Sequence, residues 1–264
     1  MEQPVITIFC AFTRYWALDQ WLSDLASMKH EPSLTNLRFI VDVDEPRIKI
    51  RLDKYAEEHN YRSFQCVLNE DNQPNEVRIA QRRKRIAEVK NQSKLLVGDA
   101  DGDYVLSLED DTVFTDLDVM RLLAPFKNPL YGFVEGVQCG RWGIKMIGAW
   151  RTDNVLNPTR IETLLPSKGI EHIDAGGFYG YFTRKHLYLM AGYFADDNPY
   201  GPDVHYGLWL RRNGWICAIN WDVVFGHNDH NRVLWPDGKI SKVSYNKLPE
   251  SELWERSDID KEIH

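Results

Sequence analysis

The segment DYVLSLEDDT, residues 103–112, joins an apolar run to three adjacent carboxylates. The run Tyr104–Leu108 is short and rich in apolar residues, which predicts a buried strand. Glu109, Asp110 and Asp111 follow where this strand ends. Ionised side by side, they repel one another and need a compensating positive charge. A divalent cation meets this need, because Mg²⁺ and Mn²⁺ take carboxylate and phosphate oxygens as ligands. A solvated acidic turn is the alternative.

Strands alternate with helices on the N-terminal side of this segment. Such alternation predicts a mostly parallel sheet covered by helices on both faces. Ligands bind such sheets at the carboxyl ends of the strands, where Asp42, Asp44 and the acidic triplet are expected to lie. The expected strands are residues 5–10, 37–41, 64–68 and 103–108, and the expected helices are 15–28, 47–60 and 77–96.

The second half of the chain is less regular, with a strand expected at 178–182, helices at 184–191 and 204–212, and a strand at 216–225. We expect one α/β domain over residues 1–248. It divides into two halves, residues 1–115 and 116–248. A charged tail, 249–264, follows.

Composition excludes several classes of protein. The net charge of -7 over 264 residues argues against a surface built for extended contact with nucleic-acid phosphates. The basic cluster at 82–85 is either a solvated helix face or part of an anion site. The four scattered cysteines form no C-x-x-C pair, which argues against a zinc knuckle or a redox dithiol, and we expect a reducing compartment. No stretch has the roughly 20 apolar residues of a membrane span or the pattern of a signal peptide, so we expect a soluble, cytoplasmic protein.

Residues 100–112 resemble the A-x-G-x-Y segment that ends in the D-x-D motif of GT-A glycosyltransferases. Here the motif is Glu109-Asp110-Asp111, with Glu in the first position. The resemblance implies a Rossmann-like GT-A fold and a nucleotide-diphosphate sugar as donor, UDP- or GDP-linked, with Mn²⁺ or Mg²⁺. It also implies that residues 1–115 form the nucleotide-sugar-binding half and residues 116–248 the acceptor-binding half. Glu109 and Asp110 would then contact the donor, and Glu109 and Asp111 would bind the metal.

Three further segments of the first half resemble donor-binding elements of the same enzymes. Residues 8–14, IFCAFTR, are similar to the first-strand P-T-Y-N-R element. Residues 39–44, FIVDVD, are similar to the second-strand segment that faces the base. Residues 83–91 resemble a helix of the Anp1/Mnn9-like mannosyltransferases, although an ordinary amphipathic helix also explains them. The resemblance assigns donor binding to Ala11, Phe12, Thr13, Arg14, Asp42, Asp44, Lys90 and Asn91. Surface capping or pairing is the alternative for Arg14 and Asp44.

Residues 203–215, DVHYGLWLRRNGW, resemble the helix of inverting family 2 that carries the catalytic base. Asp203 retains the carboxylate of that base, and Gly214 lies at the expected spacing. Pro202, His205 and Trp209 depart from the pattern. Asp203 is therefore the candidate general base, with a helix N-cap as the alternative.

The resemblance also suggests residues for the metal and for the acceptor. His227, in GHNDH at 226–230, resembles the C-terminal metal ligand of many GT-A enzymes. Gly176 and Gly177 are similar to the loop between the donor and acceptor sites, although a tight turn also explains them. Trp209 is a candidate for stacking on an acceptor sugar.

Together these patterns predict a metal-dependent glycosyltransferase that transfers a hexosyl or pentosyl group to an acceptor hydroxyl. Asp203 as base implies inversion, whereas the Anp1/Mnn9-like resemblance implies retention. The acceptor is a glycan or glycolipid precursor, or alternatively a modified nucleobase in DNA or a protein. A nucleotidyltransferase or a non-catalytic sugar-nucleotide-binding module is the third possibility. The segment at 11–14 lacks the Gly-rich loop of nucleotidyltransferases, and Asp111 and Asp203, which a non-catalytic module would be expected to lose, are both present.

Overall fold

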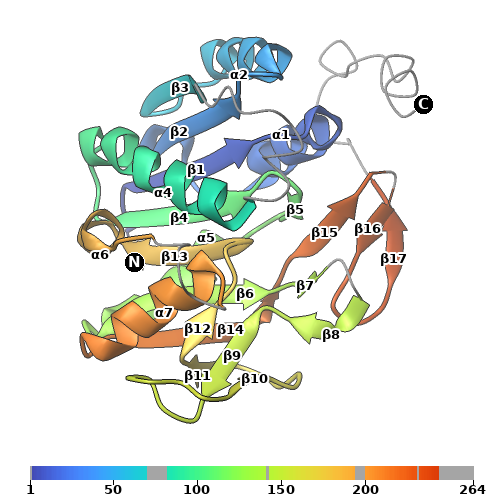
Figure 1. The fold of residues 1–264 in the computed structure, drawn as a ribbon. Coiled ribbons are helices and arrows are strands. Elements are labelled where there is room, and N and C mark those ends of the chain that lie inside the picture. Colours follow the sequence, from blue (N-terminus) through green and yellow to red (C-terminus); the bar gives the residue numbers. More distant parts are fainter. Residues whose placement is uncertain (1, 70–81, 141–142, 194–199, 231, 244–264) are drawn as a thin grey trace.

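A sheet of eight strands runs through the centre of the computed structural model, which describes residues 2–69, 82–140, 143–193, 200–230 and 232–243 (Figure 1). The strand order is β11-β14-β6-β13-β4-β1-β2-β3. Strand β1 pairs in parallel with β2 and β4, β2 with β3, and β6 with β14. Strand β13 runs antiparallel to β4 and β6, and β11 to β14. The bounds are β1 Ile6–Phe12, β2 Thr35–Asp42, β3 Ser63–Asn69, β4 Tyr104–Glu109, β6 Tyr131–Val137, β11 Ile170–Ile173, β13 Gly180–Arg184 and β14 Ile216–Val224.

One face of the sheet is covered by α1 (Leu18–Ser27), α2 (Pro46–Glu58) and α5 (Val119–Leu123). Side chains alternate between the two faces of a strand, so Ile8 and Leu106 point into this core. Trp21 is fully buried at its centre and meets the rings of Phe12 and Phe39 edge-on, at centroid distances of 4.9 and 5.4 Å. Short 3₁₀ turns lie at Tyr15–Ala17, Pro32–Leu34 and Ala124–Lys127.

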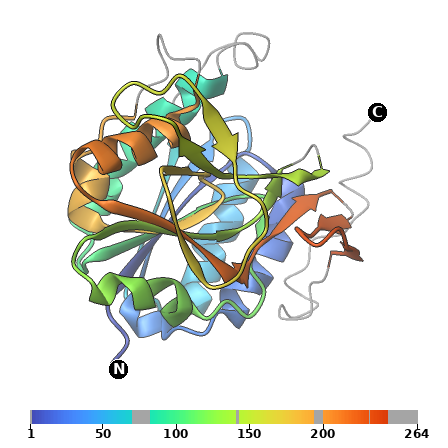
Figure 2. The ribbon, with the colours of Figure 1, turned by 90° about the horizontal axis from the view of Figure 1, so that it is seen from below.

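The opposite face carries α4 (Arg82–Asp99), α6 (Lys185–Met190) and α7 (Pro202–Arg212). Phe9, Val105 and Tyr181 point into this second core. Figure 2 shows the two groups of helices on either side of the sheet. The mixed α/β, mostly parallel sheet with helices on both faces confirms the predicted fold class.

Three smaller sheets extend the central one. Strand β9 lies between β10 and β12, near α7. Strands β5, β15, β16 and β17 form a four-stranded sheet beside the acidic end of β4, and β7 pairs with β8. The bounds are β5 Thr112–Val113, β7 Cys139–Gly140, β8 Gly143–Ile147, β9 Ala149–Thr152, β10 Ile161–Thr163, β12 Ala175–Gly176, β15 Gly226–Asp229, β16 Arg232–Leu234 and β17 Ile240–Lys242.

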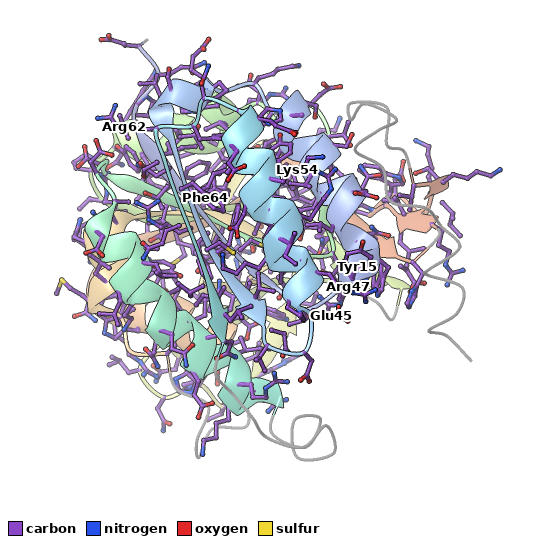
Figure 3. The ribbon with its side chains drawn as sticks, turned by 90° about the horizontal axis from the view of Figure 1, so that it is seen from above. Tyr15, Glu45, Arg47, Lys54, Arg62 and Phe64 are labelled. Carbon is purple, nitrogen blue, oxygen red and sulfur yellow. The ribbon has the colours of Figure 1, made fainter. Side chains whose placement is uncertain are left out.

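Helix α2 illustrates how local chemistry sets an element's position. Pro46 occupies the first turn, where its missing N–H costs no hydrogen bond. Arg47 then stacks its guanidinium 4.4 Å from the ring centroid of Tyr15 and lies 3.1 Å from a carboxylate oxygen of Glu45 (Figure 3). These contacts join the start of α2 to the loop that follows β1.

The predicted strands and helices agree with those observed where the structure describes them. The helix expected at 77–96 is observed from Arg82, and residues 77–81 lie outside the described residues. The charged tail at 249–264 also lies outside them. The division of the chain near residue 115 stays a prediction. Among the described helices, none is long and apolar enough to cross a membrane.

Candidate active site

A pocket of about 560 Å³ opens at the carboxyl ends of β1 and β2, under helix α4. We call it the donor pocket, because the sequence analysis predicts donor binding for half of its lining residues. It lies where open α/β sheets bind ligands. Seven of the residues predicted to bind the donor line its wall: Ala11, Phe12, Thr13, Arg14, Asp42, Lys90 and Glu109. The other lining residues are Phe9, Ile40, Asn69, Arg85, Ile86, Val89 and Leu108.

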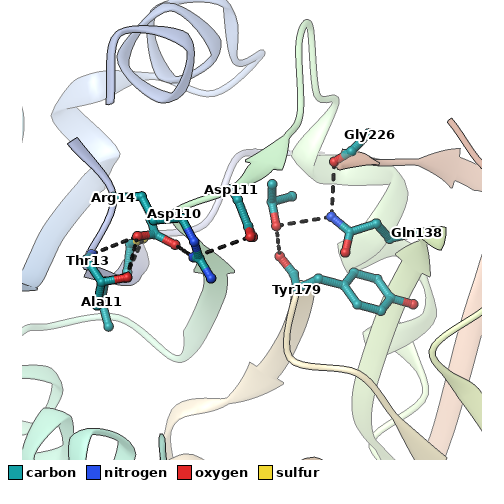
Figure 4. Close-up of polar contacts among 10 residues, drawn as sticks. Ala11, Thr13, Arg14, Asp110, Asp111, Gln138, Tyr179 and Gly226 are labelled. Atoms are coloured by element: carbon teal, nitrogen blue, oxygen red, sulfur yellow. Dashed lines mark hydrogen bonds and ion pairs between the residues drawn. The ribbon is translucent and has the colours of Figure 1, made fainter. Parts of the chain in front are cut away.

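Two members of the acidic triplet, Asp110 and Asp111, are held to the residues after β1 by hydrogen bonds and ion pairs (Figure 4). Asp110 Oδ2 accepts hydrogen bonds from the backbone N–H and the hydroxyl of Thr13, at 2.7 and 3.1 Å. Arg14 Nη1 donates to Asp110 Oδ1 and lies 3.3 Å from Asp111 Oδ2. Parallel pairing of β1 with β4 brings these groups together across 96 residues of sequence. The positive charge beside Asp110 and Asp111 is therefore the guanidinium of Arg14.

The pKa values of this cluster follow from burial and from neighbouring charges. Burial lowers the pKa of Arg14, but the carboxylates of Asp110 and Asp111 outweigh it, and the net pKa is raised. Burial, followed by the charge of Asp111, raises the pKa of Glu109 to about 7. Arg14 and Lys90 act in the opposite direction on Glu109. Arg14 therefore stays charged, whereas Glu109 titrates near neutral pH.

Lys90 is a buried cation with an aromatic surrounding. Its side chain is 6% exposed, and its Nζ donates to Ser107 Oγ at 2.5 Å. The same nitrogen lies 4.7 Å from the ring centroid of Phe178, 5.0 Å from that of Phe9 and 5.4 Å from that of Tyr181. Burial lowers the pKa of Lys90 to about 8, although the charge of Glu109 opposes the shift. Retaining a charged lysine here opposes folding, which is typical of functional rather than structural groups.

Asn69 is a polar residue of the donor pocket that the sequence analysis missed. It ends β3 as the register partner of Asp42, which ends β2. Asn69 is 6% exposed, and its Oδ1 has no hydrogen-bond partner among the described residues. Arg85 Nη2 lies 3.2 Å from Asp42 Oδ2, at the end of the neighbouring strand. An unsatisfied buried amide oxygen in a pocket wall indicates a place for a ligand's N–H group. The sequence did contain a signal for Asn69, because it is a polar residue at the end of an expected strand, as Asp42 is.

A second pocket, of about 420 Å³, adjoins the first. We call it the acceptor pocket, because it contains Asp203, the residue predicted to act on the acceptor. Glu109 and Ile86 line both pockets, so the carboxylate of Glu109 lies on their common wall. The remaining lining residues are Arg83, Trp150, Ile161, Phe178, Tyr200, Gly201, Pro202, Asp203 and Val204. Aromatic surface with a few polar groups is typical of pockets that bind organic ligands.

Asp203 enters the acceptor pocket from the first turn of α7. Pro202 starts this helix, and Asp203 Oδ1 accepts a hydrogen bond from the N–H of Val204 at 2.9 Å. Burial raises the pKa of Asp203 despite this bond. Gly214, with φ of 82°, follows the helix in a conformation that favours glycine. The spacing of Asp203 and Gly214 thus spans the length of α7.

The other predicted donor and acceptor residues lie elsewhere. Asp44 is exposed, and its backbone N–H donates to Asp42 Oδ1 at 3.2 Å. Asn91 Nδ2 donates to the carbonyl of Tyr193 at 2.9 Å, which connects α4 to the segment after α6. Trp209 packs against the core under α7, with its ring stacked on Tyr206. None of these is among the described residues that line either pocket. Trp150 provides the tryptophan of the acceptor pocket instead.

Gly176 and Gly177 permit close packing against the side chains of Glu135 and Tyr179. A Cβ at Gly176 would lie 2.5 Å from Glu135 Oε2, and one at Gly177 would lie 2.4 Å from the ring of Tyr179. The backbone N–H of Gly177 also donates to the carbonyl of Gly148 at 2.6 Å. These contacts explain both glycines by packing, and their proposed contact with an acceptor stays a prediction.

The predicted metal ligands Glu109, Asp111 and His227 do not form a three-ligand cluster. Asp111 is 1% and His227 5% exposed, and they lie next to the pairing of β5 with β15, where Asn228 N donates to the Asp111 carbonyl at 2.8 Å. Thr112 and Gln138 fix that pairing by buried hydrogen bonds (Figure 4). Within the described ranges, no three His, Cys, Asp or Glu side chains are grouped to hold a metal ion. The residues therefore do not fit a three-ligand metal centre in this arrangement. The guanidinium of Arg14 compensates the charges of Asp110 and Asp111. Metal binding by Glu109, Asp111 and His227 stays a prediction.

Comparison with solved structures places the fold among known ones. The chain resembles protein A197 from STIV, with a TM-score of 0.53 and 13% identity over 90% of this chain and 94% of that one. It also resembles the mannosyltransferase PcManGT from Pyrobaculum calidifontis, solved with GDP-Man and Mn²⁺. That match has a TM-score of 0.55 and 15% identity, and covers 85% of this chain but 56% of the mannosyltransferase. No family model matches the sequence, and no curated protein matches it. These likenesses show a shared GT-A-like fold.

Proposed function

We propose that this protein is a glycosyltransferase that uses a nucleotide-diphosphate sugar. The observation that carries the proposal is the pair of adjoining pockets with Glu109 on their common wall. One pocket lies at the strand ends where nucleotides bind in this class of sheet, and the other contains a carboxylate that can accept a proton. The mannosyltransferase of similar fold supports this assignment.

In this proposal the nucleotide occupies the donor pocket. Ile40, Ile86 and Val89 provide apolar surface for the base, while Asp42 and Asn69 present oxygen atoms at its edge. The sugar lies toward Glu109, at the boundary with the acceptor pocket. This placement puts the anomeric carbon between the leaving diphosphate and the acceptor hydroxyl.

Asp203 is the proposed general base. An acceptor hydroxyl in the acceptor pocket transfers its proton to the Asp203 carboxylate as its oxygen forms a bond to the anomeric carbon. The bond from that carbon to the diphosphate oxygen breaks, and the electron pair leaves with the nucleoside diphosphate. The configuration is inverted. A raised pKa makes Asp203 a stronger base than an exposed aspartate.

A turnover assay tests the proposal. The protein is incubated with UDP- and GDP-linked sugars, and release of nucleoside diphosphate is measured with and without candidate acceptor saccharides. We expect one donor to be consumed, and Asp203→Asn to slow its consumption about 100-fold or more while leaving donor affinity nearly unchanged. Asp222→Asn, at an exposed position outside both pockets, is the matched control.

Two results would count against the proposal in different ways. If no nucleotide sugar or nucleoside diphosphate stabilises the protein against heat, the donor pocket does not bind nucleotides. If a nucleotide sugar binds and turns over equally in wild type and Asp203→Asn, the donor assignment stands but Asp203 is not the base.

A further inference from the structure

Arg14 lies between the acidic cluster and the donor pocket. Its Nη1 contacts Asp110 and Asp111, and its side chain, 21% exposed, lines the pocket. In the described part of the chain, its hydrogen bonds and ion pairs with side chains all use Nη1. A guanidinium has five N–H donors, so further donors are available to a ligand in the pocket.

We propose that Arg14, rather than a divalent cation, binds the diphosphate of the donor and balances the charge of the leaving nucleoside diphosphate. This inference rests on the proposed function. It assigns to one side chain the task that the sequence analysis gave to a metal ion.

The geometry of the cluster supports this role. Asp110 and Asp111 both contact Nη1 of Arg14, which fixes the guanidinium before the donor arrives (Figure 4). A fixed, planar guanidinium presents its N–H groups to two phosphate oxygens at once, and needs no reorganisation when charge develops on them.

The other cations of the pocket are engaged differently. Lys90 donates to Ser107 beneath three aromatic rings, and Arg85 pairs with Asp42 at the end of β2. Among the described cations that line the pocket, Arg14 is the one that pairs with Asp110 and Asp111.

The proposed step involves no proton transfer from Arg14. As the bond between the anomeric carbon and the diphosphate oxygen breaks, its electron pair moves onto the diphosphate. Arg14 donates hydrogen bonds to the non-bridging oxygens, and these bonds strengthen as the negative charge grows.

Calorimetric binding of UDP and GDP in EDTA and in Mn²⁺ tests the inference on the wild-type protein. We expect the nucleotide that binds better to show affinities within about twofold in the two buffers. Binding that requires Mn²⁺ would overturn the role of Arg14 while leaving the proposed glycosyltransferase intact. Binding of neither nucleotide in either buffer would overturn the proposed function and this inference with it.

Substitutions in EDTA identify the residue. Arg14→Met is expected to weaken nucleotide binding about 10- to 100-fold, the range of a lost charge-assisted contact. Arg14→Lys should recover part of that loss, because it restores charge without the planar fork. Arg160→Met, at a side chain 75% exposed, is the matched control and should bind like wild type.

Because Arg14→Met leaves Asp110 and Asp111 without their cation, folding of each variant is first checked by circular dichroism. The double variant Arg14→Met with Asp110→Asn removes one charge of each sign and serves if the single variant unfolds. Wild-type affinity in either folded variant, measured in EDTA, would overturn the inference.

Discussion

Replacing the buried Lys90 by methionine should stabilise the fold and alter its pH dependence. The pKa of Lys90 falls from 10.5 to about 8 on folding, so the ammonium is disfavoured by about 3 kcal/mol relative to the unfolded chain. Methionine fits an aromatic surrounding and removes that cost. The variant loses the Ser107 hydrogen bond, worth about 1 kcal/mol, and the attraction of the ammonium to the rings, worth about 1 kcal/mol. We therefore expect Lys90→Met to be more stable by about 1 kcal/mol at pH 7.

The pH dependence gives the sharper test. Below pH 8 Lys90 is charged in both the folded and the unfolded state, and its cost is fully present. Between about pH 8 and 10.5 the folded protein has lost this proton while the unfolded chain keeps it, so wild-type stability rises with pH. The free energy of unfolding of the wild type should rise by about 3 kcal/mol relative to that of Lys90→Met across this interval.

Urea unfolding of both proteins from pH 7 to 10.5 measures this difference, because the other titrating groups are common to the pair and, among the described groups, Glu109 and Cys10 are the ones that interact with Lys90. Lys84→Met, at an exposed position on the same helix, is the control. A stability difference between wild type and Lys90→Met that does not change with pH would refute the reasoning. The proposed role of the pocket adds a second expectation, that the stabilised variant binds nucleotides more weakly.

Two further predictions follow from the described geometry. Asn69→Leu should weaken binding of the preferred nucleoside diphosphate about 5- to 10-fold, the effect of one lost hydrogen bond. Asn69→Asp keeps an oxygen atom at this position and should bind the nucleotide better than Asn69→Leu. Calorimetry measures the affinity of both variants. If Asn69→Asp and Asn69→Leu bind the nucleotide equally weakly, the side-chain N–H of Asn69 contacts the base and its oxygen does not. Gly214→Ala should cost about 1–2 kcal/mol in urea unfolding, because φ of 82° disfavours a side chain, and an unchanged midpoint would contradict this account of how α7 ends.

Much of the fold was predictable because its first half follows simple periodic rules. The strands β1, β2 and β4 are apolar runs followed by polar residues, and the helices between them bury one face. Strand β6 was missed because its segment, YGFVEGV, contains two glycines and a glutamate that is fully buried in the structure. The local sequence around a glutamate does not indicate that the tertiary fold buries its carboxyl group, so this strand could not be predicted from it.

The candidate site was predictable in part. Sequence placed Arg14, Asp42 and Glu109 at strand ends, and parallel pairing brings such ends together. It did not reveal that Arg14 contacts the acidic triplet, since that contact depends on the register of β1 against β4. Nor does residue type distinguish Trp209, which packs on the core, from Trp150, which lines the acceptor pocket. The direction of a side chain on a helix or strand becomes known only from packing.

The position of Glu109 on the wall common to both pockets has a thermodynamic consequence. Under the proposed function, a ligand in either pocket changes the electrostatic surroundings of the same carboxylate, and we expect occupancy of one pocket to alter the affinity of the other. Linkage requires the effect to be reciprocal: the factor by which donor changes acceptor affinity equals the factor by which acceptor changes donor affinity. Glu109→Gln should reduce this cooperativity, and the two substrates would then bind more nearly independently of each other.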